Sequence, residues 1–368
     1  MSPIKPKPGI LNVKPYEAGV SKLAGIENAC KLSSNESALG PSPRAVAAYQ
    51  AAAEKLHRYP DGASSDLRAA IAAHYGLAAD RIICGNGSDE LLHLLCQAYI
   101  GPGDEMVYSA HGFSIYPIAT LAAGGKPVAA PEKDHTAQVD ALLACVTPAT
   151  RILFLANPNN PTGTYVSAAE VRRLRAGLRD DILLVLDAAY AEFVRRNDYE
   201  AGIEMVSTHD NVVMTRTYSK IYGLAALRLG WAYCPAHIID VLNRVRGPFN
   251  VSLPAQAAGI AALQDSAFTQ AAIDHNEKWR GWLEEELRKL GLFSDPSVAN
   301  FLLVSFPAEP GRNAADADDF LRRNGMIVRR MEGYGLPQCL RVTVGTEAEN
   351  RDFIRIMTEF TQGKTHGG

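Results

Sequence analysis

The sequence has few of the features that mark secreted, membrane or metal-binding proteins. It contains no C-x-x-C pair, which argues against a zinc site and a disulfide framework. It also contains no run of about 18 apolar residues, and residues 1–9 have no apolar stretch of the kind found in signal peptides. We therefore expect a cytoplasmic protein without a membrane span and without a metal. The six scattered cysteines, expected to be reduced, are Cys30, Cys84, Cys96, Cys145, Cys234 and Cys339.

An excess of charge of one sign is also absent. The chain has 37 Lys and Arg against 40 Asp and Glu, a formal net charge of -3, and no basic run. Nucleic acid is therefore not an expected partner. With 47% hydrophobic and 21% charged residues, the composition is typical of a globular protein. A chain of 368 residues is long enough for one large and one smaller domain.

Short apolar segments alternate with helical ones in the first two thirds of the chain. This alternation predicts a mostly parallel sheet with helices on both faces. Ligands bind beyond the carboxyl ends of the strands in such sheets, so the residues that follow each strand are candidates for a site. The expected strands are 81–84, 106–108, 126–129, 151–156, 182–187, 211–215 and 230–233. The expected helices among them are 88–99, 114–123, 136–145 and 167–177.

The pattern changes after residue 230. Helices are expected over 235–290, including a long amphipathic one from about Phe268 to Leu290, followed by short strands and helices. This predicts a small α+β domain, completed by the N-terminal arm, which is rich in Pro, Gly and Ser. The expected division is an arm with part of the small domain at 1–48, a large domain at 49–245, and a connecting helix with the small domain at 246–368.

Polar residues follow three of the expected strands. The segment 85–90, Gly-Asn-Gly-Ser-Asp-Glu, opens a helix and could hold a phosphate at the helix N-terminus or simply cap it. It is not a dinucleotide fingerprint, because Glu90 stands at the third glycine position. Asn160 lies in a proline-rich turn and offers an amide to a phenolate oxygen. Asp187 follows an apolar strand, so its carboxylate needs a cation or hydrogen bonds in the interior.

The segment 215–230 contains a single lysine, Lys220. A desolvated lysine has a lowered pKa and can form a Schiff base with an aldehyde. Ser219 precedes it and Arg228 follows eight positions later, and both could hold a phosphate. Pyridoxal 5'-phosphate (PLP) carries an aldehyde and a phosphate on one ring. Taken alone, however, the Ser-Lys pair is more typical of a surface turn.

Considered together, these motifs identify a family. Asn160-Pro-Thr-Gly, Asp187-x-x-Tyr190, Ser219-Lys220 and Arg228, in this order and spacing, resemble the fold-type I PLP-dependent aminotransferases. More narrowly, the chain resembles the histidinol-phosphate aminotransferase family over nearly its whole length. The narrower resemblance rests on Leu32-Ser-Ser-Asn35-Glu36, Tyr59-Pro-Asp-Gly, Gly87-Ser-Asp-Glu, Ser219-Lys-x-x-Gly-Leu-Ala-x-Leu-Arg228-x-Gly and Leu340-Arg341-Val-Thr-Val-Gly345.

The resemblance implies an aspartate-aminotransferase-like α/β fold with PLP as cofactor. Lys220 would be the Schiff-base lysine and proton shuttle, and Asp187 would pair with the pyridine nitrogen. Tyr190 and Asn160 would hold the phenolic oxygen of the ring, and Phe113 would stack on its face. The implied phosphate ligands are Ser88, Asp89, Thr217, Ser219 and Arg228. Tyr59 would reach the cofactor phosphate of the other subunit, which implies a homodimer with shared sites.

The implied substrates are small amines and 2-oxo acids. Histidinol phosphate would place its phosphate near four residues, Arg341, Arg329, Tyr16 and Asn35, and 2-oxoglutarate would leave as glutamate. An aromatic amino-acid aminotransferase would use the same arginines for a carboxylate. Decarboxylation or acyl transfer is less favoured, because Arg341 would keep the carboxylate bound. A PLP-binding regulator would need a basic DNA-binding module, and a binding protein without PLP would need an inert, exposed Lys220.

Overall fold

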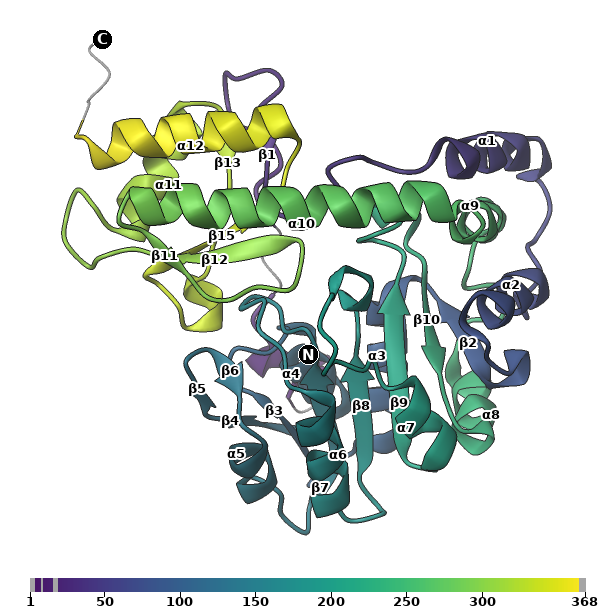
Figure 1. The fold of residues 1–368 in the computed structure, drawn as a ribbon. Helices are drawn as coiled ribbons and strands as arrows, with labels where there is room; N and C mark the ends of the chain where they lie inside the picture. Colours follow the sequence, from purple (N-terminus) through teal and green to yellow (C-terminus); the bar gives the residue numbers. More distant parts are fainter. Residues whose placement is uncertain (1–3, 8, 16–18, 364–368) are drawn as a thin grey trace.

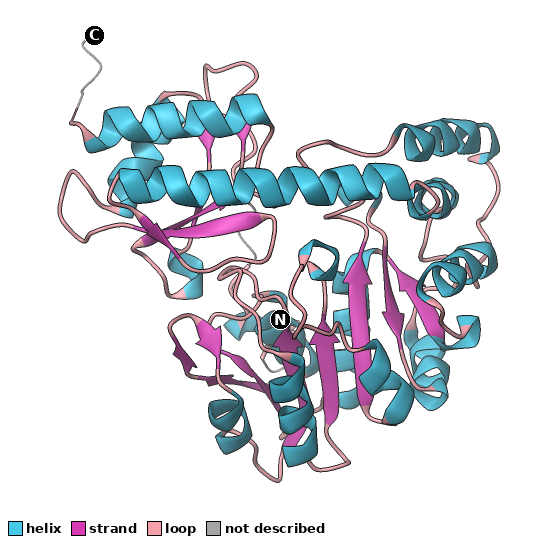
Figure 2. Cartoon of the chain, viewed as in Figure 1, coloured by secondary structure: helices cyan, strands magenta, loops and turns pink. Residues whose placement is uncertain are grey.

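The computed structural model describes residues 4–7, 9–15 and 19–363, and it contains two principal sheets (Figure 1). The larger sheet, with helices on both sides, forms the lower part of the view. The smaller sheet lies at the upper left beneath two helices, and the long helix α10 (Ser266–Lys289) crosses between the two regions. Figure 2 shows the same view by secondary structure, with loops meeting between the two sheets.

The larger sheet has seven strands in the order β2-β10-β9-β8-β7-β3-β4. Only β10 runs antiparallel to its neighbours, so the expected mostly parallel sheet is confirmed. Its strands are β2 (Ile82–Gly85), β3 (Glu105–Ser109), β4 (Lys126–Ala130), β7 (Thr150–Ala156), β8 (Leu183–Asp187), β9 (Val212–Thr217) and β10 (Gly230–Tyr233).

Both faces of this sheet are buried, which explains why its strands are apolar throughout. Along β8, Leu184 and Leu186 belong to one core cluster, whereas Leu183 and Val185 belong to the other, because successive side chains point to opposite faces. The helices that precede α10 are α1 (Pro43–Ala52), α2 (Ser65–Tyr75), α3 (Gly87–Tyr99), α4 (Ile115–Ala123), α5 (Val139–Ala144), α6 (Ala168–Gly177), α7 (Ile203–Thr208), α8 (Ala236–Val245) and α9 (Leu253–Leu263).

One expected helix begins later than predicted. Residues 132–137 form a hairpin of β5 (Glu132–Lys133) and β6 (Thr136–Ala137), and α5 begins only at Val139. Asp134 and His135 at the hairpin turn have φ of 48° and 52°. Such left-handed backbone at both central residues is typical of tight hairpin turns and is incompatible with a helix.

The smaller sheet has the order β11-β12-β15-β14. A separate two-stranded pair joins the N-terminal arm to this region, because β1 (Cys30–Lys31) runs parallel to β13 (Met326–Ile327). The arm therefore completes the small region as expected, although the domain boundaries themselves remain a prediction. The other elements are β11 (Phe293–Ser294), β12 (Phe301–Ser305), α11 (Ala314–Arg323), β14 (Arg329–Arg330), β15 (Cys339–Thr343) and α12 (Glu347–Thr361).

Within the described residues, no helix is both long enough and apolar enough to cross a bilayer. The same residues contain no group of three or more His, Cys, Asp or Glu side chains arranged to hold a metal ion.

Candidate active site

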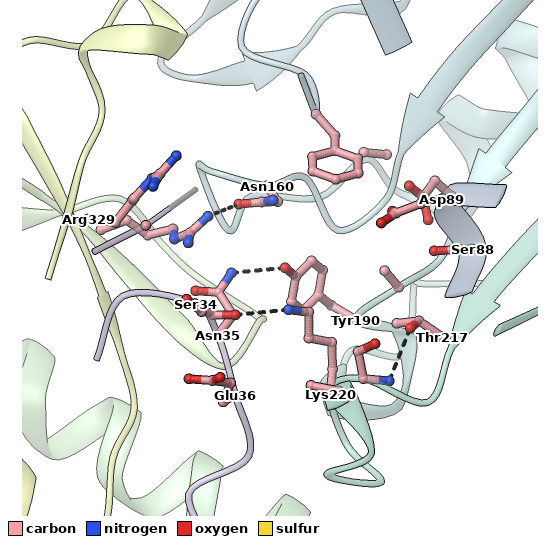
Figure 3. A pocket seen from close by; sticks show the side chains of 18 of the residues that line it. Ser34, Asn35, Glu36, Ser88, Asp89, Asn160, Tyr190, Thr217, Lys220 and Arg329 are labelled. Atoms are coloured by element: carbon pink, nitrogen blue, oxygen red, sulfur yellow. Dashed lines mark hydrogen bonds between the residues drawn. The ribbon is translucent and has the colours of Figure 1, made fainter. Parts of the chain in front are cut away.

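A cavity of about 330 Å³ lies between the arm, the carboxyl ends of the large sheet and the small sheet (Figure 3). Its volume is within the range of small-molecule sites. Thirteen of the fifteen predicted site residues line it: Asn35, Ser88, Asp89, Phe113, Asn160, Asp187, Tyr190, Thr217, Ser219, Lys220, Arg228, Arg329 and Arg341.

Lys220 lies in the turn that follows β9, and its side chain points toward the arm (Figure 3). Its Nζ donates a hydrogen bond to the carbonyl oxygen of Ser34 at 3.0 Å. Burial, with a smaller contribution from the nearby charge of Arg341, lowers the pKa of Lys220 to about 8. A substantial fraction of this amine is therefore neutral near physiological pH, as a nucleophile or a base requires.

Asp187 ends β8 with its carboxylate in the interior. Tyr116 Oη donates to one carboxylate oxygen at 2.8 Å, and Thr215 Oγ1 donates to the other at 3.2 Å. Burial raises the pKa of Asp187 to about 6, and these two hydrogen bonds oppose that rise. No Lys or Arg of the described part of the chain pairs with this carboxylate. A buried carboxylate that has donors and lacks a cation is suited to a cationic ligand group.

Asn35 of the arm lines the cavity and links residues of its two walls. Its Nδ2 donates to Tyr190 Oη at 2.9 Å, and its backbone N–H donates to Thr343 Oγ1 of β15 at 2.9 Å. Burial raises the pKa of Tyr190, so its hydroxyl stays protonated. The arm thus fixes a tyrosine of the large sheet against the small sheet.

The end of the cavity beside the N-terminus of α3 has the shape and the charge of an anion-binding site. Arg228 donates to Ser219 Oγ at 3.1 Å and to Asp89 Oδ2 at 3.2 Å, beside the N-terminus of α3. Gly87 at this N-terminus has φ of 78°, and a Cβ there would lie 2.4 Å from Arg228 Nη2. The left-handed backbone at this position favours glycine, and a side chain there would displace the Arg228 guanidinium. A guanidinium, a hydroxyl and a helix N-terminus together favour a phosphate.

Arg341 of β15 approaches from the small sheet. Its guanidinium donates to Asn160 Oδ1 and, at 2.7 Å, to the carbonyl oxygen of Ser33, and it lies 5.4 Å from the centre of the Phe301 ring. The side chain is therefore buried and held in place rather than exposed. Arg329 lines the same end of the cavity (Figure 3). Two guanidinium groups there favour a carboxylate or phosphate on the substrate.

Two predicted residues are not part of this cavity. The side chain of Tyr59 is 81% exposed and stacks on Phe249 with the ring centres 4.6 Å apart. It therefore contributes nothing to the site of its own chain, and its proposed role in a second subunit stays a prediction. Tyr16 lies outside the described residues.

The sequence reasoning missed several residues of the site. Ser33 and Ser34 contribute backbone carbonyls, which no side-chain motif reveals. Tyr334 lines the cavity from a turn of the small region that contains no recognisable motif. Tyr116 was detectable in principle, because it stands three residues after Phe113 at the start of a helix expected at a strand's carboxyl end.

The residues present fit PLP. Lys220 is a half-buried amine with a lowered pKa, and Asp187 is a buried carboxylate without a cationic partner among the described residues. The cradle of Gly87, Ser219 and Arg228 is suited to a phosphate. An aldehyde, a pyridine nitrogen and a phosphate are the three groups that such a set would bind.

Comparisons with known proteins agree with this geometry. The family model described as aminotransferase class I and II matches residues 27–356. The chain therefore belongs to the class I and II aminotransferases. The aspartate aminotransferase of Thermus thermophilus shares this fold, with a TM-score of 0.80 over 90% of this chain and 91% of that one at 21% identity.

Relatives of higher sequence identity identify a narrower family within this class. The chain is 60% identical to the histidinol-phosphate aminotransferase of Paramagnetospirillum magneticum, over 96% of this chain and 98% of that one. It is 55% identical to that of Rhodopseudomonas palustris strain BisB18, over 98% and 99%. The crystal structure of the Sinorhizobium meliloti enzyme in complex with PLP superposes with a TM-score of 0.87 at 29% identity, covering 94% and 92%. These relatives place the chain within the histidinol-phosphate aminotransferase family.

Proposed function

We propose that the chain catalyses PLP-dependent transamination of L-histidinol phosphate with 2-oxoglutarate, giving imidazole-acetol phosphate and glutamate in histidine biosynthesis. The observation that carries this proposal is the half-buried Lys220, which lies in one cavity with Asp187 and Arg341. Identity of 55–60% to the named relatives supports the choice of substrate.

PLP, when bound, supplies an aldehyde that reacts with amines and a ring that accepts the electron pair released at the substrate's α-carbon. Asp187 would hold the protonated ring nitrogen, and Ser219, Arg228 and the start of α3 would hold the phosphate. Asn160 and Tyr190 would bind the phenolic oxygen. Because each group is already fixed by a hydrogen bond, little reorganisation is needed on binding.

Lys220 is the only lysine among the described residues that line this cavity, so it is the amine placed to move protons there. In its neutral form, Nζ would take up the proton from the substrate's α-carbon, and as an ammonium group it would release that proton again within the cavity. The carbonyl of Ser34 holds Nζ while it is protonated. A pKa of about 8 suits this role, because the group must both accept and donate near neutral pH.

Arg341 and Arg329 would bind the anionic end of the substrate. The same guanidinium groups suit the phosphate of histidinol phosphate and the carboxylate of 2-oxoglutarate, which must enter the cavity in turn. They would also suit the carboxylate of an aromatic amino acid. The arginines alone therefore do not select between these two amines.

The test compares kcat/KM for L-histidinol phosphate and L-phenylalanine, each with 2-oxoglutarate, on the PLP-loaded protein. We expect a large preference for L-histidinol phosphate and no turnover by a Lys220→Ala variant. Comparable or reversed values would assign the enzyme to aromatic amino acids. If neither amine changes the visible absorption of the bound cofactor, the aminotransferase proposal is wrong.

The proposal includes a homodimer with shared sites, in which Tyr59 reaches the cofactor phosphate of the partner subunit. The exposed pair of Tyr59 and Phe249 supports this, since large aromatic side chains at the surface are typical of interfaces. Mixing the inactive variants Lys220→Ala and Tyr59→Ala before refolding tests it. Each mixed dimer would contain one intact site, so roughly a quarter of wild-type activity should return. No recovery would contradict sharing. The cytoplasmic location stays a prediction.

A further inference from the structure

Tyr116 lies directly behind the carboxylate of the candidate site. It stands in the first turn of α4, its side chain is 1% exposed, and Oη donates to Asp187 Oδ2 at 2.8 Å. Its ring stacks on Phe154 of β7 with the ring centres 4.6 Å apart and the planes within 2°. This packing fixes the ring, so the hydroxyl has one direction available, toward Asp187.

We propose that Tyr116 is a positioning residue that keeps Asp187 ionised and correctly oriented for the cofactor's ring nitrogen. This inference rests on the proposed function, because it assigns Tyr116 a role through the Asp187–cofactor contact. No motif that led to the site includes Tyr116.

The physical argument begins with the cost of a buried charge. Burial disfavours the charged form of a carboxylate, and hydrogen bonds to the charged form oppose that effect. Asp187 has one side-chain donor on each oxygen, Tyr116 and Thr215, with a smaller contribution from the backbone of Ala189. The Tyr116 bond is the shorter of the two, so its loss should have the larger effect.

The neighbouring titratable groups cannot replace this donor. Asp89, on α3, raises the pKa of Asp187, and Tyr190 and Tyr199 are further titratable groups that interact with it. Burial and the charge of Asp187 raise the pKa of Tyr116 itself, so Tyr116 stays protonated and can only donate. Without it, a protonated Asp187 becomes more favourable near neutral pH, and a neutral carboxyl group cannot pair with a cationic ring nitrogen.

Tyr116 also contacts the aromatic residue expected to stack on the cofactor. The rings of Phe113 and Tyr116 meet edge to face, with centres 5.9 Å apart and an interplanar angle of 89°. One side chain thus supports both the carboxylate and the stacking ring. A Tyr116→Phe substitution removes only the hydroxyl and keeps both ring contacts, so it isolates the effect on Asp187.

The experiment measures PLP affinity against pH in the full-length chain. A Lys220→Ala background makes binding reversible and removes the titration of Lys220. Tyr116→Phe, Thr215→Val and Asp187→Asn are each added to it, with Tyr99→Phe as the matched control. The Tyr99 hydroxyl is buried and has no hydrogen-bond partner among the described residues, and Tyr99 does not line the cavity. Circular dichroism verifies that every variant is folded.

We expect Tyr116→Phe to weaken PLP binding about tenfold at pH 7, the effect of losing one hydrogen bond to a charged group. As the pH is lowered and Asp187 becomes protonated, PLP binding should fall. The pH at which it falls to half should be about one unit higher in Tyr116→Phe than in the parent, with a smaller rise in Thr215→Val and none in Tyr99→Phe. If Tyr116→Phe matches Tyr99→Phe in both readings while Asp187→Asn weakens binding, the role assigned to Tyr116 is wrong. If Asp187→Asn binds PLP as tightly as its parent, the proposed function fails at Asp187 and this inference fails with it.

Discussion

At the scale of single residues, burial shifts the two principal titratable groups toward neutrality. Lys220 has its pKa lowered to about 8, whereas Asp187 has its pKa raised to about 6. Desolvation is the largest cause of both shifts, because Asp187 is buried and the side chain of Lys220 is largely surrounded by protein. Neutrality makes the amine usable for chemistry. The carboxylate, in contrast, must remain ionised for its proposed function, and this requirement costs stability in the protein without cofactor.

This cost predicts that Asp187→Asn stabilises the cofactor-free protein above pH 6. The pKa of Asp187 is about 6 when folded against 3.8 as the reference, so the folded state holds its proton more tightly. Stability present below pH 3.8 is therefore lost as pH rises to 6. Two pKa units correspond to about 3 kcal/mol at most. Urea unfolding of the wild type and of Asp187→Asn at pH 4 and pH 8 measures the difference in their free energies of unfolding. A difference that does not grow in favour of Asp187→Asn as the pH rises would contradict the prediction.

The lowered pKa of Lys220 predicts that this amine becomes reactive at a lower pH than an ordinary lysine. Competitive acylation of the cofactor-free protein, read by mass spectrometry, should give half-maximal labelling of Lys220 near pH 8, against 10.5 for an ordinary lysine. Arg341→Gln should raise this midpoint, because it removes a nearby positive charge. Surface lysines labelled in the same reaction normalise the reagent. A midpoint above pH 10 would exclude a desolvated amine.

The motifs predicted which side chains form the site better than they predicted the contacts that surround those side chains. Asp187 and Lys220 follow apolar strands, so their burial and their place beyond a strand end could be inferred from sequence. The contacts of Tyr116 and Ser34 could not, since they depend on how α4 and the arm pack against those strand ends. Asn160 was expected at the cofactor's phenolic oxygen, and the structure adds that Arg341, 181 residues away in sequence, fixes its amide.

At the scale of elements, β10 contacts the N-terminus of α3 so closely that only glycine fits. A Cβ at Gly230 would lie 2.3 Å from the backbone nitrogen of Ser88 and 2.5 Å from the carbonyl carbon of Gly87. These atoms belong to the backbone that would hold the cofactor phosphate. Neither can move without displacing the start of the helix.

We therefore expect Gly230→Ala to lower the free energy of unfolding by about 1–3 kcal/mol and to weaken PLP binding. Denaturant titration and PLP titration measure the two effects. Gly281→Ala, in α10, is the matched control, because a Cβ there meets nothing within 4 Å. It should leave PLP binding unchanged and raise stability by up to about 1 kcal/mol. Equal behaviour of the two variants would show that the predicted clash is relieved at no cost.

Most strands of the large sheet were predictable because each is a short, continuous apolar run, as β8 is, which is typical of strands buried on both faces. Where an observed helix boundary differs from the predicted one, a local backbone conformation or a capping side chain determines where the helix begins. The expected helix at 136–145 loses its first residues to β6, which follows the hairpin turn at Asp134 and His135, and neither of these two turn residues is a glycine or a proline. The amphipathic helix expected from about Phe268 instead begins at Ser266, where the Asp265 side chain caps it.

At the scale of the whole molecule, the cavity has walls from both sheets and from the arm, so a bound cofactor should stabilise the fold as a unit. PLP at 100 times its Kd stabilises by about 2.7 kcal/mol, which should raise the Tm by roughly 2–5 °C. Differential scanning calorimetry measures the shift. Pyridoxal, which lacks the phosphate, should give a smaller shift at equal concentration. An equal shift would exclude Arg228 and α3 from binding the phosphate.

The contact between Asn35 and Thr343 spans 308 positions of the chain and has a consequence for synthesis. A ribosome adds about 5–20 residues per second, so the roughly 120 residues between Lys220 and Thr343 take on the order of 6–25 s. Throughout that interval the nascent chain carries Lys220 without the wall that Arg341 and the anchored arm provide. Truncated products that lack β15 therefore cannot form a complete site, and catalytic competence arises only once the last strand has been made.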